Sequence, residues 1–489
     1  MEETHPAAGH GPVWNPSRPP AEGFTNFLWM LLMAIPHAWH LDPLNFARGV
    51  GIASLLGSFA VTFAFALRLC DSPDASTRRL SACVAVFILA SFYPASAHAV
   101  SGMETSLFSL LVTAFLYLAV FVPERSTHLD MATVPLAGLL LGLTRPDGLV
   151  VAACGLFLVW LRCDRKQRLR LLSWSLALLV LPGSIYFLWR ATYYGHLLPL
   201  PFYLKVGHRS GLAGVPHVVG FLEYFALPMA PLLALGVFRL RGRIVPALVA
   251  VTALLLFYLV PRHTMGFQWR FVAPVFPTLA VIAACGVPPL VDRIATATGR
   301  LRAVQAAVIL LVCPALAFAS FRTFPHQIRY ANSYAAVLAE VQTPLGQELR
   351  SLRGDGPRPV LAIGDAGVVP YYSEWESIDT AGLNERLTDI EGPPDVSTVV
   401  ARNPDLVVLN SLDRRSPMMT ERQLALYHAC EKDGMRRVRV VKGGPAFLWL
   451  LARPGSRFAE ALEGWPANRG PNVRLARRAL EDRIPRFAR

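Results

Sequence analysis

Recurring apolar runs are the feature that most constrains how this chain folds. Only 16% of its residues are charged and 53% are hydrophobic, whereas soluble proteins carry about 25% charged residues. A helix needs roughly 20 apolar residues to cross a bilayer core. Ten runs approach or exceed this length: 45–69, 79–98, 104–122, 129–144, 148–161, 171–190, 217–237, 244–261, 271–290 and 303–321. We therefore predict a mostly α-helical, polytopic membrane bundle of about ten spans, the fourth and fifth of which are short.

The loops between these runs differ in charge, and the difference predicts their side of the membrane. Five short loops carry fifteen Lys and Arg residues: 68–79, 123–128, 162–170, 239–243 and 291–302. The loops that alternate with them carry six: 101–105, 145–148, 190–217 and 261–270. Because basic residues gather in cytoplasmic loops, we predict the first set inside and the second set outside. Ten spans in this phase place both chain ends outside.

The segment "TNFLWMLLMAIPHAWH", at residues 25–40, is apolar but short for a span. Its tryptophans, Trp29 and Trp39, favour the headgroup level. We predict a helix lying in the outer interface, because an additional span would break the alternation of the loops.

The net charge of +14 does not indicate nucleic-acid binding, because its basic residues fall in loops that a membrane protein keeps in the cytoplasm. Of the seven cysteines, only Cys430 lies in residues 322–489, so that part cannot form an internal disulfide. The sequence has no C-x-x-C spacing of the kind that binds a metal.

Candidate functional residues lie where the predicted outer loops meet the spans. Arg145 and Asp147 occupy the four-residue turn "RPDG" between two apolar runs. Ionisable residues at membrane depth are costly and usually functional, although in such a turn they also simply snorkel or pair with each other. Glu104 follows Ser101 at the spacing of a capping box, which is its structural interpretation. It also lies beside His98 on the predicted outer face.

The longest outer loop combines aromatic and basic residues. Tyr194 and its aromatic neighbours suit stacking on a sugar, and Lys205 suits neutralising a phosphate; the alternative is an aromatic belt at the interface. Arg270 opens the run 271–290, where it either holds a lipid phosphate or anchors the helix. The outer face thus carries three cations and three acids: Arg145, Lys205, Arg270, Glu22, Glu104 and Asp147. Such a set suits an amphiphilic anionic ligand.

Five motifs in order carry a family resemblance. They are "GHGPVWNPSRPPAEGFTNFLWMLLMA", "SGMETSLF", "LTRPDG", "YYGHLLPLPFYLK" and "WRFVAPVFP". Together they resemble the bacterial membrane glycosyltransferases of the GT-C class, and most of all the branch that contains the mycobacterial terminal arabinofuranosyltransferase. The later stretch "AIGDAGVVPYYSEWESIDTAGLNE" is similar to the same branch.

The resemblance implies a function and a site. GT-C enzymes transfer a sugar from a polyprenyl-phosphate donor to a glycan, lipid or protein acceptor on the outer face of the membrane, here a bacterial inner (plasma) membrane. Nine residues match the substrate-binding segments of the family: Glu22, Thr25, Asn26, Glu104, Arg145, Asp147, Tyr194, Lys205 and Arg270. Leu200 and Pro201 replace an Asn–Thr pair that the family often has, which puts the hydrogen bonds of that pair in doubt.

The resemblance also implies a catalytic acid in the first outer loop, as general base on the acceptor hydroxyl. In the family this acid belongs to a "DDAFIS"-like motif upstream of the segment that matches "GPVWNP", and the 489 residues begin just after that point. We therefore expect the catalytic acid upstream of Met1 and hypothesise an N-terminally truncated chain. A cofactor is not predicted, and a divalent-metal requirement stays open.

Two alternatives to an active glycosyltransferase remain. A secondary transporter or lipid flippase is disfavoured, because the sequence shows no internal repeat and no matched pair of broken helices. The second alternative is a catalytically inactive, truncated relative.

The chain is expected to divide into a GT-C-like membrane domain at 1–325, an outside α/β domain at 326–460 and a basic tail at 461–489. Four short apolar segments of the second domain predict strands: "PVLAIGD", "DLVVLN", "RRVRVV" and "AFLWLLA". We expect this domain to cover the active site or to help bind the acceptor. The arginine-rich tail suits solvent or a lipid surface.

Overall fold

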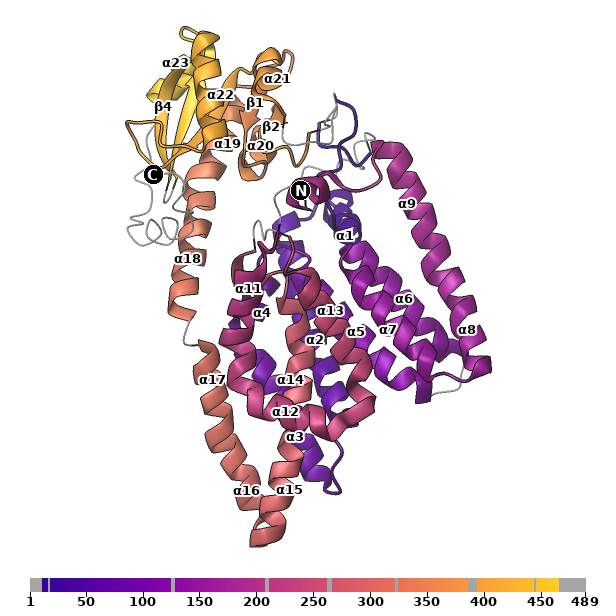
Figure 1. Ribbon diagram of the computed structural model, residues 1–489. Coiled ribbons are helices and arrows are strands. Elements are labelled where there is room, and N and C mark those ends of the chain that lie inside the picture. The colour runs from indigo at the N-terminus through magenta and orange to yellow at the C-terminus, as the bar shows by residue number, and fades with distance from the viewer. Residues whose placement is uncertain are drawn as a thin grey trace. The chain divides into compact units, whose positions relative to one another are not determined.

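The computed structural model describes residues 11–15, 18–124, 128–206, 211–261, 266–321, 324–385, 394–443 and 446–465. These residues form two compact units, coloured along the chain in Figure 1. The membrane unit lies within Thr25–Leu197 and Lys205–Pro325. The sheet unit combines described residues of Met1–Phe24, Leu198–Leu204 and His326–Arg489.

All ten apolar runs fold as helices. Six helices are long and apolar enough to span a membrane: Pro43–Leu69, Thr105–Glu124, Arg165–Tyr194, Val215–Phe257, Ala273–Thr298 and Leu301–Ala319. A seventh arises when α3 (Ala75–Ser91) and α4 (Tyr93–Ala99), bent by 65°, count as one. The multi-pass membrane fold is confirmed, but by length alone the described residues hold six or seven spans rather than ten.

The difference in span number has two structural reasons. The first is that Val215–Phe257, which counts as one span of 43 residues, contains two of the predicted runs. The backbone breaks between these runs at Arg241 (φ 44°, ψ −128°), which separates α12 (Ala230–Leu240) from α13 (Val245–Phe257). In addition, α6 (His128–Thr144) and α7 (Gly148–Arg162) are apolar but have only 17 and 15 residues. The predicted interfacial helix is α1 (Phe27–Ala38), whose 12 residues are too few to cross a bilayer.

Local sequence explains where several helices begin and end. Asp42 caps α2 (Pro43–Leu69) by accepting the Asn45 N–H at 2.6 Å, and Pro43 takes the first helical position. Asp164 and Gln167 form a capping box at α8 (Arg165–Ser175). A π-turn (Leu176–Val180) joins α8 to α9 (Leu181–Tyr194), and α9 ends at Gly195 in the left-handed conformation.

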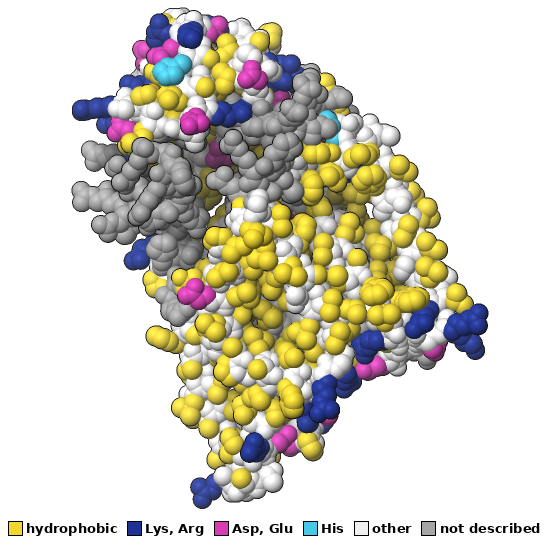
Figure 2. Space-filling model, viewed as in Figure 1, with side chains coloured by type: hydrophobic (Ala, Val, Ile, Leu, Met, Phe, Trp, Pro, Cys, Tyr) yellow, Lys and Arg dark blue, Asp and Glu magenta, His cyan; other side chains and the backbone are white. Residues whose placement is uncertain are grey.

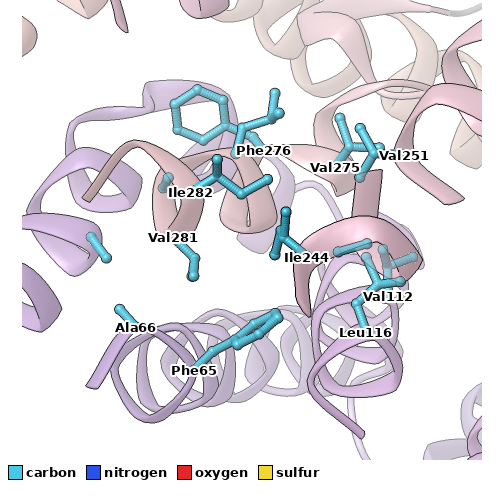
Figure 3. Close-up of a cluster of buried hydrophobic side chains, with 14 of the residues drawn as sticks. Phe65, Ala66, Val112, Leu116, Ile244, Val251, Val275, Phe276, Val281 and Ile282 are labelled. Carbon is cyan, nitrogen blue, oxygen red and sulfur yellow. The ribbon is translucent and has the colours of Figure 1, made fainter. Parts of the chain in front are cut away.

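The core of the membrane unit surrounds α14 (Phe276–Ala284), in which every residue is buried. Figure 3 shows Phe65 of α2, Leu116 of α5 (Thr105–Phe121) and Ile282 of α14 within one cluster. Helix α12 approaches α14 so closely that a Cβ on Gly236 would lie 1.9 Å from the Ile282 carbonyl oxygen. Small residues at such crossings let backbones pack directly.

The remaining helices complete both units. In the membrane unit they are α11 (Val215–Phe221), α15 (Val287–Thr298), α16 (Leu301–Ala307) and α17 (Cys313–Phe321). The segment α18 (Phe324–Val337) runs from one unit to the other in sequence. Residues Leu200–Val206 form α10.

The sheet unit holds five strands in the order β2-β1-β3-β5-β4. They are β1 (Val360–Ile363), β2 (Glu376–Asp379), β3 (Leu406–Ser411), β4 (Arg436–Gly443) and β5 (Ala446–Ala452). Strands β2, β1 and β3 are parallel, and β3, β5 and β4 are antiparallel. The predicted α/β fold and its four predicted strands are confirmed, while β2 was not predicted.

Helices cover both faces of this sheet because strand side chains alternate. One face packs Leu361 and Ile363 against α19 (Thr343–Ser351), α20 (Val368–Ser373) and α23 (Arg457–Gly464). The opposite face packs Ala362 and Val407 against α21 (Val396–Ala401) and α22 (Glu421–Lys432). From residue 466 onward, the predicted basic tail lies outside the described residues.

The N-terminal segment extends the sheet at its β2 edge. The Asn15 amide donates to the Ser377 carbonyl at 2.8 Å and accepts the Ser377 N–H at 3.0 Å. Arg18 and Glu376 form an ion pair at 2.5 Å. The carbonyl of Glu22 accepts the Leu200 N–H at 3.3 Å. The backbone N–H and C=O of Ser377, on the edge strand β2, are thus paired by a side chain rather than by another strand.

Candidate active site

The five basic loops lie together at one end of the membrane unit. Figure 2 shows Lys and Arg side chains gathered along one border of the hydrophobic surface. Contacts join the loops: Arg68 and Arg243 with Glu124, Ser72 with Asp292, and Arg162 with the Val120 carbonyl.

The predicted site residues lie at the other end of the same helices. Helix α5 begins after Glu104 and leads to Glu124, a rise of roughly 1.5 Å per residue. Helix α13 runs from Val245, next to the basic end, to Tyr258 at the site end. The acidic and basic residues of the site are therefore separated from the basic loops by the length of a span.

Glu104 is the centre of the site. Its carboxylate accepts Arg270 Nη2 at 2.8 and 3.0 Å, on one oxygen each, and Asn26 Nδ2 at 3.1 Å. Glu104 is only 3% exposed. Burial acts to raise the pKa of Glu104, but the Arg270 and Arg145 guanidinium groups outweigh it and hold the pKa at about 2. Glu104 is therefore ionised at neutral pH.

The capping-box interpretation of Glu104 is wrong. Glu104 sits at the N-cap of α5 without a side-chain hydrogen bond to the helix. Ser101 instead donates to the His98 carbonyl at 2.9 Å and accepts the Met103 N–H. The long-range partner Arg270 attracts the carboxylate more strongly than a local N–H, because the pair is buried and charged.

Arg145 and Asp147 form a second buried group with Tyr258. Arg145 Nε donates to Asp147 at 3.1 Å, Arg145 Nη2 donates to the Tyr258 hydroxyl at 2.5 Å, and that hydroxyl donates to Asp147 at 2.6 Å. Burial acts to lower the pKa of Arg145, but Asp147, Tyr258 and Glu104 raise it above its ordinary value. Arg145 thus pairs with Asp147, as one interpretation of the turn predicts, and also lies in the field of Glu104.

Two guanidinium donors in this site stay unsatisfied. Arg145 Nη1 and Arg270 Nε are buried and have no hydrogen-bond partner among the residues that the structure describes. Buried donors without an acceptor are rare in native proteins and call for an explanation, such as a bound ligand. Within the described ranges, no group of three His, Cys, Asp or Glu side chains suits a metal ion.

Four predicted residues remain: Thr25, Tyr194, Glu22 and Lys205. Thr25 is half-buried directly before α1. Tyr194 is buried at the end of α9, edge-on to Tyr193 at 4.9 Å. Glu22 is 1% exposed and belongs to the sheet unit. The side chain of Lys205 lies outside the described residues.

Sequence reasoning missed Tyr258. It ends an apolar run, where an aromatic residue is typical of the membrane interface, so only its contact with Arg145 and Asp147 distinguishes it.

Comparison with known proteins places this fold. A family model for a domain of unknown function (DUF8728) matches residues 327–451, and no curated protein matches the chain. The crystal structure of ArnT from Cupriavidus metallidurans in the apo state aligns over 88% of both chains, with a TM-score of 0.59 at 14% identity. The chain has the fold of ArnT, which is the fold that the GT-C resemblance predicts.

Two further structures align with this chain. ArnT from Cupriavidus metallidurans bound to undecaprenyl phosphate covers 88% of both chains, with a TM-score of 0.52 and 14% identity. The Archaeoglobus fulgidus oligosaccharyltransferase, tethered to an acceptor peptide, has a TM-score of 0.49 and 11% identity over 84% of this chain and 64% of that one. The predicted GT-C class is confirmed as a fold, while the mycobacterial branch stays a prediction.

Proposed function

We propose that this chain is a membrane glycosyltransferase that takes a sugar from a polyprenyl-phosphate donor. The acceptor is a cell-envelope glycan, lipid or protein at the outer face of a bacterial inner membrane. The observation that carries the proposal is a pair of guanidinium groups around Glu104: that of buried Arg145 and that of partly buried Arg270. Each keeps a buried N–H without a partner in the described part of the chain.

These donors suit the phosphate that leaves when the sugar is transferred. Arg binds phosphate oxygens through several N–H groups, and fixed donors aimed at a developing negative charge lower the barrier of transfer. The charges of Glu104, Arg270, Arg145 and Asp147 cancel one another. An anion would therefore be held by N–H donors rather than by excess charge, with Lys205 as the additional cation that the sequence predicts.

We assign Glu104 to the orientation of Arg270, and not to proton transfer. Its pKa of about 2 makes it a weak base, because efficient general bases have a pKa near the working pH.

The charge of the loops supports an outer site. Fourteen described basic residues lie in the loops at the end opposite to Glu104, and such loops face the cytoplasm. The Cys70–Cys285 disulfide lies near that basic end, although disulfides are rare in the cytosol. The charge of five loops is a stronger indicator of orientation than one cysteine pair. The solved complex of ArnT with undecaprenyl phosphate supports a polyprenyl-phosphate ligand, and the sequence resemblance favours a pentose of the arabinofuranosyl type.

Transfer from a radiolabelled polyprenyl-phosphate pentose or hexose tests the proposal. Membranes containing the wild-type chain should label an envelope acceptor, and Arg145→Ala or Arg270→Ala should abolish the labelling. Arg243→Ala, at the basic end, is the matched control and should retain it. Labelling that survives both site substitutions would refute the proposal, as would uptake of the lipid without transfer, which a transporter or flippase would produce.

A further inference from the structure

Two consecutive residues before Arg270 adopt a backbone conformation that side chains disfavour. Gln268 has φ 54° and ψ 32°, and Trp269 has φ 52°. The left-handed region is costly for residues other than glycine, and such strain persists only where the surroundings hold it. Within the described ranges, the other non-glycine residues with positive φ occur singly. Among the described residues, the segment that presents Arg270 to Glu104 is therefore the place where two consecutive non-glycine residues have positive φ.

His98 holds this turn from one side. Its Nε2 lies 2.9 Å from the Gln268 carbonyl oxygen, and since a carbonyl only accepts, Nε2 carries the proton. His98 is 2% exposed and Gln268 is 7% exposed, so water does not compete for this bond. The bond reaches the carbonyl of a left-handed residue two positions before Arg270.

Aromatic packing also holds the turn. The Trp269 ring lies edge-on to Phe225 at 5.0 Å and to Tyr224 at 5.8 Å. Trp269 is therefore fixed by its ring and Gln268 by its carbonyl. Arg270 follows with its guanidinium on Glu104, at the site end of the membrane unit.

We propose that His98 is a positioning residue of the phosphate site. By holding the Gln268 carbonyl it keeps the strained turn in place, so that Arg270 meets both Glu104 and the phosphate of a polyprenyl-phosphate ligand. The identity of the ligand in this inference rests on the proposed function. The contact between His98 and the Gln268 carbonyl does not. His98 does not contact the reacting atoms in this assignment.

The surroundings of His98 allow a conservative test. A small pocket of about 20 Å³ borders His98 together with Thr105 and Ser106. Because Gln and Leu are close to the imidazole in size, they replace it without overpacking. His98→Gln keeps an N–H donor near the Nε2 position, whereas His98→Leu keeps volume and removes the donor. Gln268→Gly keeps the carbonyl and removes the strain at position 268, while Trp269 stays unchanged. Arg241→Gly removes a comparable positive φ (44°) at the basic end and serves as control.

The experiment measures binding of polyprenyl phosphate to the purified full chain. We expect His98→Leu to raise Kd about tenfold, because small misplacements at a site are costly, and His98→Gln to stay close to the wild type. Adding Gln268→Gly to His98→Leu should restore most of the affinity, and adding Arg241→Gly should not. Equal weakening in a folded His98→Gln variant, or equal rescue by Arg241→Gly, would overturn the inference.

Thermal unfolding of the same variants separates this inference from the proposed function. His98→Leu and Gln268→Gly should have strongly non-additive effects on Tm, because residues in contact couple; additive effects would overturn the role of His98 in the turn. Failure of the wild-type chain to bind polyprenyl phosphate would instead refute the proposed function, and with it the ligand named here.

Discussion

Glu104→Gln removes the charge at the centre of the site and keeps its shape. The variant leaves the partly buried Arg270 without its carboxylate partner, and breaking a buried pair costs about 3 to 5 kcal/mol. The pKa of Glu104 gives a similar magnitude. A fall from 4.5 to about 2 corresponds to about 3 kcal/mol in favour of the ionised form.

The same helix provides the control. Glu124 lies at the other end of the span Thr105–Glu124 and pairs with Arg243 at 3.0 Å, but its side chain is 36% exposed. Exposed pairs contribute about 0 to 1 kcal/mol. Glu124→Gln should therefore have a small effect on stability.

Thermal unfolding of the purified chain measures the difference. With about 1 °C for each kcal/mol in a chain of 489 residues, we expect Glu104→Gln to lower Tm by roughly 3 to 5 °C, and Glu124→Gln by roughly 1 °C or less. Equal shifts in the two variants would refute the buried, charged state of Glu104.

Three further predictions follow from the structure. The folded pKa of Glu104 is depressed, so its stabilisation is complete above pH 4.5 and is lost as the pH falls toward 2; the Tm difference between wild type and Glu104→Gln should shrink over that window, and a constant difference would contradict it. Asn15→Ala removes both hydrogen bonds to buried Ser377 and should lower the stability of the sheet unit by about 1 to 3 kcal/mol, measured by chemical denaturation; an unchanged midpoint would contradict the contact. Gly236→Ala places a Cβ against the Ile282 carbonyl and should cost about 1 to 3 kcal/mol by overpacking, which lowers Tm by about 1 to 3 °C. Gly242→Ala, which meets no atom within 4 Å, should leave Tm unchanged.

The helices could be predicted because apolar length and loop charge are local properties of the sequence. All ten runs are helical, and the short runs at α6 and α7 were visible as short. Strand β2 was not predictable in the same way, because "ESID" alternates too weakly over four residues to stand out.

The pairing within the site was beyond sequence reasoning. The residues were found, since ionisable groups at the ends of apolar runs are conspicuous. Their hydrogen-bond partners could not be predicted, because Glu104 and Arg270 are 166 positions apart. A local capping box also explained the position of Glu104 equally well. The left-handed turn at Gln268 and Trp269 had no sequence signature either, because glycine, the usual residue of that conformation, stands two positions earlier at Gly266.

Discrimination between polyprenyl phosphate and the corresponding polyprenol tests the central claim most directly. Both lipids share the apolar chain, so only the phosphate reports on Arg145 and Arg270. We predict that the wild-type chain binds the phosphate at least about tenfold more tightly, or about 1.4 kcal/mol, and that this preference disappears in Arg145→Ala/Arg270→Ala. Equal affinity for the two lipids in the wild type, or an undiminished preference in the folded double variant, would contradict the account.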